Sequence, residues 1–258
     1  MKGLVYLIQQ RIRSDLMYVG GAAKLLLEAI YYGIRPPYQL GLILQEIENI
    51  GINSMTVVNV IALFTGMVLA LQTATALSRF GAKGFIGVVV ALSLVREIGP
   101  VFTGLMVAGR VGSGIAAEIG SMKVTEQIDA IRVMGANPVK RLVVPKLIAT
   151  IVALPLLTIV ADILGIIGGL LISVMEFQIT SYYYFTTILE KMSVQDVASG
   201  IGKTFFFGLI IAIIGCYQGM TTTGGTVGVG RSTTTTVVVS SILILVTDFF
   251  LTKIFLLL

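Results

Sequence analysis

Four ionisable side chains interrupt long apolar stretches of the chain. Arg96 and Glu97 lie within "VALSLVREIGPVFTGL" (90–105), and Lys203 and Asp248 lie within two later apolar runs. An Arg, Lys or Asp at the centre of a membrane-spanning helix costs roughly 2.5–3.5 kcal/mol on insertion scales, so such residues seldom face lipid. We therefore expect the two positive and the two negative side chains to meet inside the protein.

Two interpretations of this charged cluster are open. It is either a set of salt bridges that joins three helices, or the polar lining of a cavity that takes the charged headgroup of an amphiphile; the two are compatible. Adjacent residues on one helix do not face each other, so Arg96 and Glu97 should find partners on other helices. Asp162 lies in a third apolar run without an evident partner, and we expect it to hydrogen-bond within the helix packing.

The composition indicates which kind of element must position these side chains. The chain has 258 residues, of which 56% are hydrophobic and 12% charged, whereas soluble domains carry about 25% charged residues. Residues 49–78 contain no charge at all, and roughly 20 apolar residues suffice to cross a bilayer. The sequence therefore predicts an all-α integral membrane protein with one helical membrane domain.

The apolar runs divide into five predicted spans. The second could be one long helix kinked at Pro100, or two shorter segments that turn at "REIGP". Basic residues concentrate in segments 1–48 and 118–146, so both should be cytoplasmic. An even number of crossings must separate them, which favours one span, a cytoplasmic N-terminus and a periplasmic C-terminus. The five spans are 53–78, 85–117, 147–175, 198–221 and 233–258.

The region 1–52 precedes the spans and is predicted to be an amphipathic, membrane-interfacial region that leads into the five-span domain, 53–258. Its first stretch is basic and apolar on opposite faces, which suits a helix on the membrane surface; packing on the protein's own body is the alternative. A second amphipathic stretch follows Pro36 and Pro37. The apolar positions are Leu4, Ile8, Ile12, Leu16 and Val19, then Leu40, Leu44, Ile47 and Ile50.

Small residues recur at every fourth position of the third span, which lets helix backbones approach closely. We favour packing within the subunit over a dimer seam for this set. The set is Ala161, Gly165, Gly169 and Ser173.

Several classes of function are disfavoured by what the chain lacks. It has no histidine and one cysteine, Cys216, which leaves no imidazole–thiolate metal site and no internal disulfide. The basic residues flank apolar spans instead of forming a nucleic-acid-binding face. "GKT" at 202–204 lacks the glycine that a phosphate-binding loop needs at position 197, and the Gly/Thr-rich stretch 221–236 is predicted to be a flexible turn. No ATP site is therefore expected in this chain.

From Arg96 onward the sequence resembles a known family. "REIGPVFTGLMVAGRVGSGIAAEIGSMKVTEQIDAIRVMGANPVKRLVVPK" (96–146), "FTGMVLALQ" (64–72) and "GGTVGVGRSTTTTVVVSS" followed by the aspartate of "VTDFFLT" are similar to MlaE/YrbE permeases. These are membrane subunits of the Mla-type ABC system that moves phospholipid between bacterial membranes, with relatives in chloroplasts.

The resemblance implies an assembly with defined partners. It implies a homodimer in the bacterial inner membrane, a cytoplasmic ABC ATPase (MlaF-like) that binds the ATP and Mg, and a periplasmic MCE-domain lipid-binding protein (MlaD-like). The chain itself would have no catalytic residue and no cofactor, and its substrate would be phospholipid. The alternative function is an ion-coupled secondary transporter or channel that uses the intramembrane charges without an ATPase.

The resemblance also assigns a coupling helix at about 118–135 that docks on the ATPase. The apolar contacts there would come from Ile119, Met122, Ile128, Ile131 and Met134, and the polar ones from Glu118, Glu126, Gln127 and Asp129.

For the lipid, the resemblance implies a cavity at the dimer centre. Arg96, Glu97, Lys203 and Asp248 would form its charged part, with Arg96 as the partner of the lipid phosphate because a guanidinium binds bidentately. The apolar wall would come from the first span, through Leu69, Leu77 and Phe80.

Overall fold

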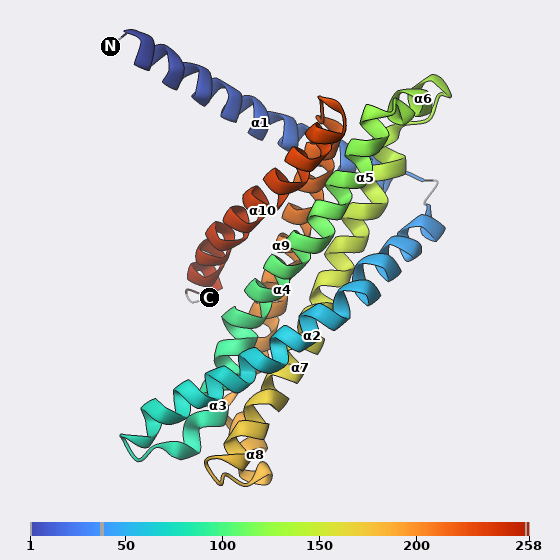
Figure 1. Cartoon of the computed structure of the whole chain (residues 1–258). Helices are drawn as coiled ribbons and strands as arrows, with labels where there is room; N and C mark the ends of the chain where they lie inside the picture. The colour runs from blue at the N-terminus through green and yellow to red at the C-terminus, as the bar shows by residue number, and fades with distance from the viewer. Residues whose placement is uncertain (1, 37–38, 256, 258) are drawn as a thin grey trace.

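The computed structural model describes residues 2–36, 39–255 and 257, with the backbone alone for residues 2–12, 14 and 15. Every regular element in that part of the chain is helical (Figure 1). The α-helices are α1 (Lys2–Ile34), α2 (Leu40–Ser78), α3 (Ile86–Ser93), α4 (Gly99–Val107), α5 (Ser113–Val124), α6 (Gln127–Val133), α7 (Val144–Met175), α8 (Ser181–Lys191), α9 (Val194–Met220) and α10 (Gly225–Phe255). A 3-10 turn, η1 (Lys83–Phe85), and three π turns, η2 (Leu94–Ile98), η3 (Ala108–Gly112) and η4 (Val139–Val143), adjoin them.

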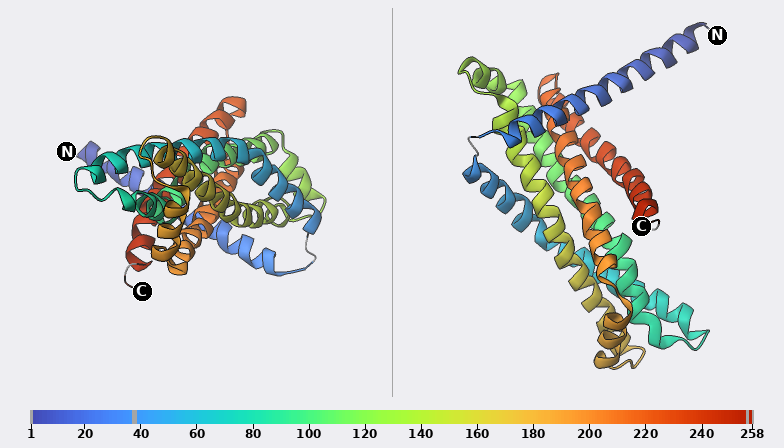
Figure 2. Two further views of the ribbon diagram at one scale, coloured as in Figure 1. Left: turned by 90° about the horizontal axis from the view of Figure 1, so that it is seen from below. Right: turned by 180° about the vertical axis from the view of Figure 1, so that it is seen from behind.

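Five helical segments within the described residues are long and apolar enough to cross a membrane, which confirms the all-α fold and the five predicted spans. They run side by side along the bundle, while α6 lies at one end and α8 at the other (Figures 1 and 2). Most extend beyond the predicted boundaries, since helices continue into the headgroup layer. The five are Leu40–Ser78, Lys83–Val124, Val139–Met175, Val194–Met220 and Gly225–Phe255.

The second span is one continuous helical segment from Lys83 to Val124, as charge distribution favoured. The π turn η2 lies directly before Pro100, which has no backbone N–H and would clash with the carbonyl four residues earlier in a regular helix. The wider π turn removes this conflict without breaking the helix. It also leaves the carbonyl of Arg96 free to accept a hydrogen bond from elsewhere.

Helix α1 leaves the bundle obliquely near the start of α10, with its N-terminus far from the other helices (Figures 1 and 2). Ala22, Leu25 and Ala29 are buried against the bundle, whereas Leu16 and Val19 are 67% and 64% exposed. The helix therefore packs on the body through one face and keeps apolar side chains exposed on another, while its location at the membrane surface stays a prediction. The side chains of Leu4, Ile8 and Ile12 lie outside the described residues.

The second amphipathic stretch is not a separate helix. Helix α2 runs unbroken from Leu40 to Ser78, so the boundary placed at residue 52 does not coincide with a helix end. Ile50 is buried and Ile47 packs on the core, while Leu40 and Leu44 are exposed. No proline interrupts α2, so one helix carries both the amphipathic stretch and the first span.

The core is built around α7, which packs along α2 and against α9. A Cβ on Gly66 of α2 would lie 1.8 Å from the carbonyl oxygen of Gly165, so the two backbones touch at this point. Ala161, Gly165, Gly169 and Ser173 are all buried. The predicted use of these small residues for packing within the subunit is confirmed.

The prediction of a flexible turn at 221–236 is wrong over most of its length. Only residues 221–224 lie outside helices, and α10 begins at Gly225. The threonine hydroxyls donate to carbonyls within the same helix, for example Thr235 to Arg231 at 2.9 Å and Thr236 to Ser232 at 2.8 Å. Such back-bonding lets a Thr-rich segment remain helical.

Candidate functional site

Lys203 of α9 forms the centre of a charged cluster, the Lys203 cluster (Glu97, Lys203, Asp248 and Thr252). Its side chain is 1% exposed, and its Nζ lies 2.6 Å from Oε2 of Glu97 and 3.1 Å from Oδ1 of Asp248. Three spans that are distant in sequence therefore meet at one ammonium group. The sequence predicted this encounter of charges.

Two neutral groups complete the coordination of Lys203. Its Nζ donates to the backbone carbonyl of Arg96 at 3.0 Å and to Oγ1 of Thr252 at 2.6 Å. The Thr252 hydroxyl in turn donates to Oε2 of Glu97 at 3.1 Å. The Arg96 carbonyl is the one that Pro100 cannot engage, so the proline supplies the acceptor that the buried lysine needs.

Arg96 itself pairs elsewhere. Its Nε donates to Oδ1 of Asp196 at 2.7 Å, and its Nη2 contacts the same oxygen. Oδ2 of Asp196 accepts from the backbone N–H of Ser193 at 2.8 Å, and the Ser193 hydroxyl accepts from the N–H of Asp196, which together form a capping box at the start of α9. Asp196 was missed because it precedes the apolar run, although Ser-x-x-Asp before such a run is a recognisable cap.

The helix backbones touch where the cluster forms. A Cβ on Gly200 would lie 1.9 Å from the carbonyl oxygen of Val95, and a Cβ on Gly99 would lie 1.8 Å from Oδ1 of Asp162. Glycine at these positions therefore allows η2 to approach α9 and α7. Asp162 is buried, and its Oδ1 has no hydrogen-bond partner among the described residues, so the hydrogen bond expected of it is not seen at that atom.

A cavity of about 630 Å³ opens beside the cluster. Arg96, Glu97 and Lys203 line it, together with Asp196 and Thr252. Asp248, the remaining member of the cluster, pairs with Lys203 but does not line the cavity.

The predicted apolar wall lies away from this cavity. Leu69 and Leu77 are half-buried and pack against Ala70, Ala74 and their neighbours within the subunit. Phe80 is 83% exposed at the turn after α2. None of the three lines the charged cavity of the single chain.

The segment 118–135 is two helices and not one. Glu118 and Met122 lie on the last turns of α5, and α6 begins at Gln127 after Glu126, whose φ of 61° is left-handed. Ile119, Ile128 and Ile131 are buried in the subunit's own core, which corrects the expectation that they offer apolar contacts. Glu126, Gln127, Met134 and the unpredicted Val133 are exposed.

Asp129 has partners within this segment. Nζ of Lys123 donates to its Oδ2 at 2.9 Å, and Nη1 of Arg132 donates to its Oδ1 at 3.2 Å. The hydrogen bond from Lys123 lowers the pKa of Asp129 below its usual value. These contacts tie α6 back to the end of α5.

A second buried lysine was not predicted. Nζ of Lys146 lies 2.6 Å from Oε1 of Glu46 and 2.7 Å from Oε2 of Glu118, and its side chain is 4% exposed. We call Glu46, Glu118 and Lys146 the Lys146 cluster; it joins α2, α5 and α7. The sequence contained no signal for this cluster, because Lys146 is one of several basic residues in the segment 118–146, which is predicted to be cytoplasmic.

Within the described residues, no group of three or more His, Cys, Asp or Glu side chains is arranged to hold a metal ion. Both lysine clusters instead hold an ammonium group between carboxylates.

Comparison with known proteins places this chain in a family. Residues 43–254 match the family model described as Permease MlaE. A probable ABC transporter permease protein of Rickettsia felis is 46% identical over 86% of this chain and 86% of its own length. A probable ABC transporter permease protein of Synechocystis is 44% identical over 81% of this chain and 80% of its own length.

A chloroplast protein of Arabidopsis thaliana named TRIGALACTOSYLDIACYLGLYCEROL 1 is 40% identical over 82% of this chain and 61% of its own length. The family match covers all five membrane-spanning segments apart from the first residues of α2 and the last residue of α10. The chain therefore belongs to the MlaE family and is a multi-pass permease subunit of an ABC transporter, not itself the ATPase.

Proposed function

We propose that this permease moves phospholipid between the inner membrane and an MCE-domain partner, driven by a separate ATPase. The observation that carries the proposal is the charged cavity beside the Lys203 cluster, where Leu92 and Phe255 lie next to the charged lining among the membrane-spanning segments. A cavity of this kind suits an amphiphile, since acyl chains need an apolar wall and a headgroup needs charge. The name of the Arabidopsis relative refers to a galactosyl diacylglycerol, which supports a lipid substrate in general.

The charged residues divide into two roles. Lys203 is buried and has partners on three segments, so it holds η2, α9 and α10 in place. Arg96 is 46% exposed and faces the cavity, so a lipid phosphate can replace or share its contact with Asp196. A planar guanidinium binds phosphate bidentately, which makes Arg96 the proposed headgroup partner.

The direct test uses the purified transporter reconstituted with its ATPase and MCE partner. We expect Arg96→Gln to lower ATP-driven phospholipid transfer at least about tenfold, the effect of losing one charge-assisted interaction worth about 1.4 kcal/mol. Because Arg96 is half exposed, the melting temperature of the Arg96→Gln variant should differ little from that of the unaltered protein. Arg79→Gln removes an exposed arginine at the same end and serves as the control.

Unchanged phospholipid transfer by the Arg96→Gln variant would refute the proposed function. Transfer by the chain alone, driven by an ion gradient, would instead support the ion-coupled alternative.

We also propose that α6 and the turn before it dock on the ATPase. Glu126, Gln127, Val133 and Met134 form an exposed polar and apolar surface at the end of the bundle. The double variant Glu126→Lys with Gln127→Ala should abolish stimulation of the ATPase by lipid while leaving the permease folded. Stimulation equal to that of the unaltered protein would exclude this docking surface.

The assembly proposed is a homodimer with a cytoplasmic N-terminus and a periplasmic C-terminus. Many exposed side chains of α2 and α10 are apolar, for example Phe64, Val68 and Phe249, which suits contact with lipid or a second copy. In the dimer, Leu69, Leu77 and Phe80 are proposed to complete the apolar wall of the lipid cavity.

The single cysteine, Cys216, is fully buried, which makes topology easy to measure. We expect Val133→Cys to react with a membrane-impermeant thiol reagent from the cytoplasmic side and Phe80→Cys from the periplasmic side. The reverse labelling pattern would invert the proposed orientation.

A further inference from the structure

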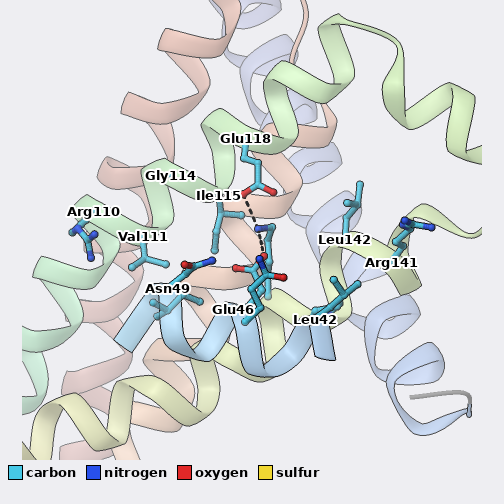
Figure 3. A pocket seen from close by; sticks show the side chains of 14 residues that line it. Leu42, Glu46, Asn49, Arg110, Val111, Gly114, Ile115, Glu118, Arg141 and Leu142 are labelled. Atoms are coloured by element: carbon cyan, nitrogen blue, oxygen red, sulfur yellow. Dashed lines mark hydrogen bonds and ion pairs between the residues drawn. The ribbon is translucent and has the colours of Figure 1, made fainter. Parts of the chain in front are cut away.

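A second charged cavity lies at the opposite end of the bundle from the Lys203 cluster. It has a volume of about 660 Å³ and lies between the first turns of α2, the segment from η3 into α5, and the start of α7 (Figure 3). The Lys146 cluster forms its centre, with Glu46 and Glu118 on either side of the lysine.

The charges that face this cavity do not cancel. Lys146 is held by two carboxylates, so that group carries one net negative charge and two of the three ammonium donors are occupied. Arg110 and Arg141 also line the cavity, at its two sides (Figure 3). In the part of the chain that the structure describes, neither guanidinium has a carboxylate within 4 Å; Arg110 donates to the hydroxyl of Ser54 at 2.9 Å. Two guanidinium groups thus remain for an anion.

The depth of Arg110 matches a phosphate layer. From Phe85, the start of the second predicted span, to Arg110 the helix advances about 38 Å at ~1.5 Å per residue. The hydrocarbon core of a bilayer is about 30 Å thick, and the headgroup layers begin beyond it. Arg110 therefore lies near the level of the headgroups in the leaflet on the α6 side.

Much of the remaining lining is apolar, which favours an amphiphile over a free anion, and Gln45 and Asn49 add two polar side chains. Leu42, Ile115 and Leu142 form the walls next to the charged residues. Gly114 also lines the cavity, and a Cβ at this position would have no atom within 4 Å. The wall there is open, so there is room for part of a ligand beside α5.

We propose that this cavity binds the phosphate-bearing headgroup of a phospholipid from the leaflet on the α6 side, with Arg110 as the principal phosphate partner and Arg141 at the opposite rim. The Lys146 cluster fixes Glu46 and Glu118 to the lysine, which keeps their negative charges away from the phosphate. The proposal rests on the proposed lipid function for the class of ligand and adds a second binding place to it.

The test is native mass spectrometry of the purified protein in detergent, with phosphatidylglycerol or a phosphate-free glycolipid of the same acyl chains added. All variants carry Arg96→Gln, so that lipid held at the Lys203 cluster does not contribute. We expect Arg110→Gln to lower phosphatidylglycerol retention about tenfold, the loss of one charge-assisted interaction. Gly114→Leu should lower it similarly by filling the cavity while keeping both arginines. Arg231→Gln removes an exposed arginine that does not line the cavity and should retain the lipid.

Each outcome separates the alternatives. Retention unchanged in both Arg110→Gln and Gly114→Leu overturns the proposal, and so does equal retention of the glycolipid. Displacement of phosphatidylglycerol by a millimolar excess of inorganic phosphate would overturn it by assigning the site to a free anion. Failure here leaves the transfer assay of Arg96→Gln untouched, whereas unchanged transfer in that assay refutes the proposed function whatever this cavity retains.

Discussion

The two buried lysines of this permease are both held between carboxylates, but in different surroundings. Lys203 and Lys146 each hold two carboxylates from two other helices. Lys203 is 1% exposed and also donates to a carbonyl and a hydroxyl. Lys146 lies at the end of the bundle, where Glu118 is 54% exposed. Each lysine borders a cavity of similar size.

The difference shows how burial decides what a charged cluster can do. At the Lys203 cluster the lysine is 1% and Asp248 18% exposed, although Glu97 is 41% exposed, so removing the lysine leaves Asp248 with little access to water. At the Lys146 cluster a freed carboxylate can turn to solvent. We therefore expect the first cluster to control stability more strongly than the second.

The largest expected effect is that of Lys203→Met. It should lower the free energy of unfolding by about 3–5 kcal/mol, because Glu97 and Asp248 then face each other without a cation. Thermal unfolding in detergent, followed by size exclusion, measures the loss. Lys191→Met, at an exposed lysine of α8 on the same end of the bundle, is the control; equal melting temperatures for both variants would contradict the comparison.

A glycine in each region offers the next test. Gly200→Ala should cost about 1–3 kcal/mol, because its Cβ would overlap the Val95 carbonyl and must push α9 away from η2. Gly114→Ala faces open space beside the Lys146 cluster and should be neutral or slightly stabilising, since alanine is the better helix former. Unfolding in denaturant compares the pair, and the idea fails if Gly114→Ala is the more harmful change.

A smaller loss is expected from Lys146→Met, about 1–2 kcal/mol. The ion pairs to Glu46 and Glu118 disappear, but water can reach at least Glu118. The same thermal assay as for Lys203→Met gives the ratio of the two effects. A loss as large as that of Lys203→Met would show that exposure of the carboxylates does not matter here.

The smallest effect concerns the exposed pair of Asp129 and Lys123, where solvent screening is strongest. The pKa of Asp129 is lowered in the folded protein by its hydrogen bond from Lys123. The pair therefore stabilises α6 above the unfolded-state pKa of about 4 and loses this effect as the pH falls through the lower folded value. The protection factors of the α6 amides, corrected for the pH dependence of intrinsic exchange, should fall below about pH 4 in the parent protein and change less in Asp129→Asn.

The sequence could predict the Lys203 cluster because charge inside an apolar run is visible without a structure. The same reasoning could not find the Lys146 cluster or Asp196, since both sit where charged residues are ordinary. The prediction that the apolar residues of 118–135 contact a partner was wrong for a related reason. Helical spacing shows that Ile119, Ile128 and Ile131 share an environment, but not whether that environment is a partner or the protein's own core.

The sequence alone determined the number of spans, the helical class and the family, because length, hydropathy and motif spacing are properties of the chain itself. Only the tertiary structure decided which carboxylate meets which cation and that a proline supplies a carbonyl to Lys203. Only the tertiary structure placed two charged cavities at opposite ends. Those outcomes depend on how helices α2, α4, α5, α7, α9 and α10 are rotated against one another, and close backbone contacts such as Gly66 with Gly165 and Gly200 with Val95 set that rotation.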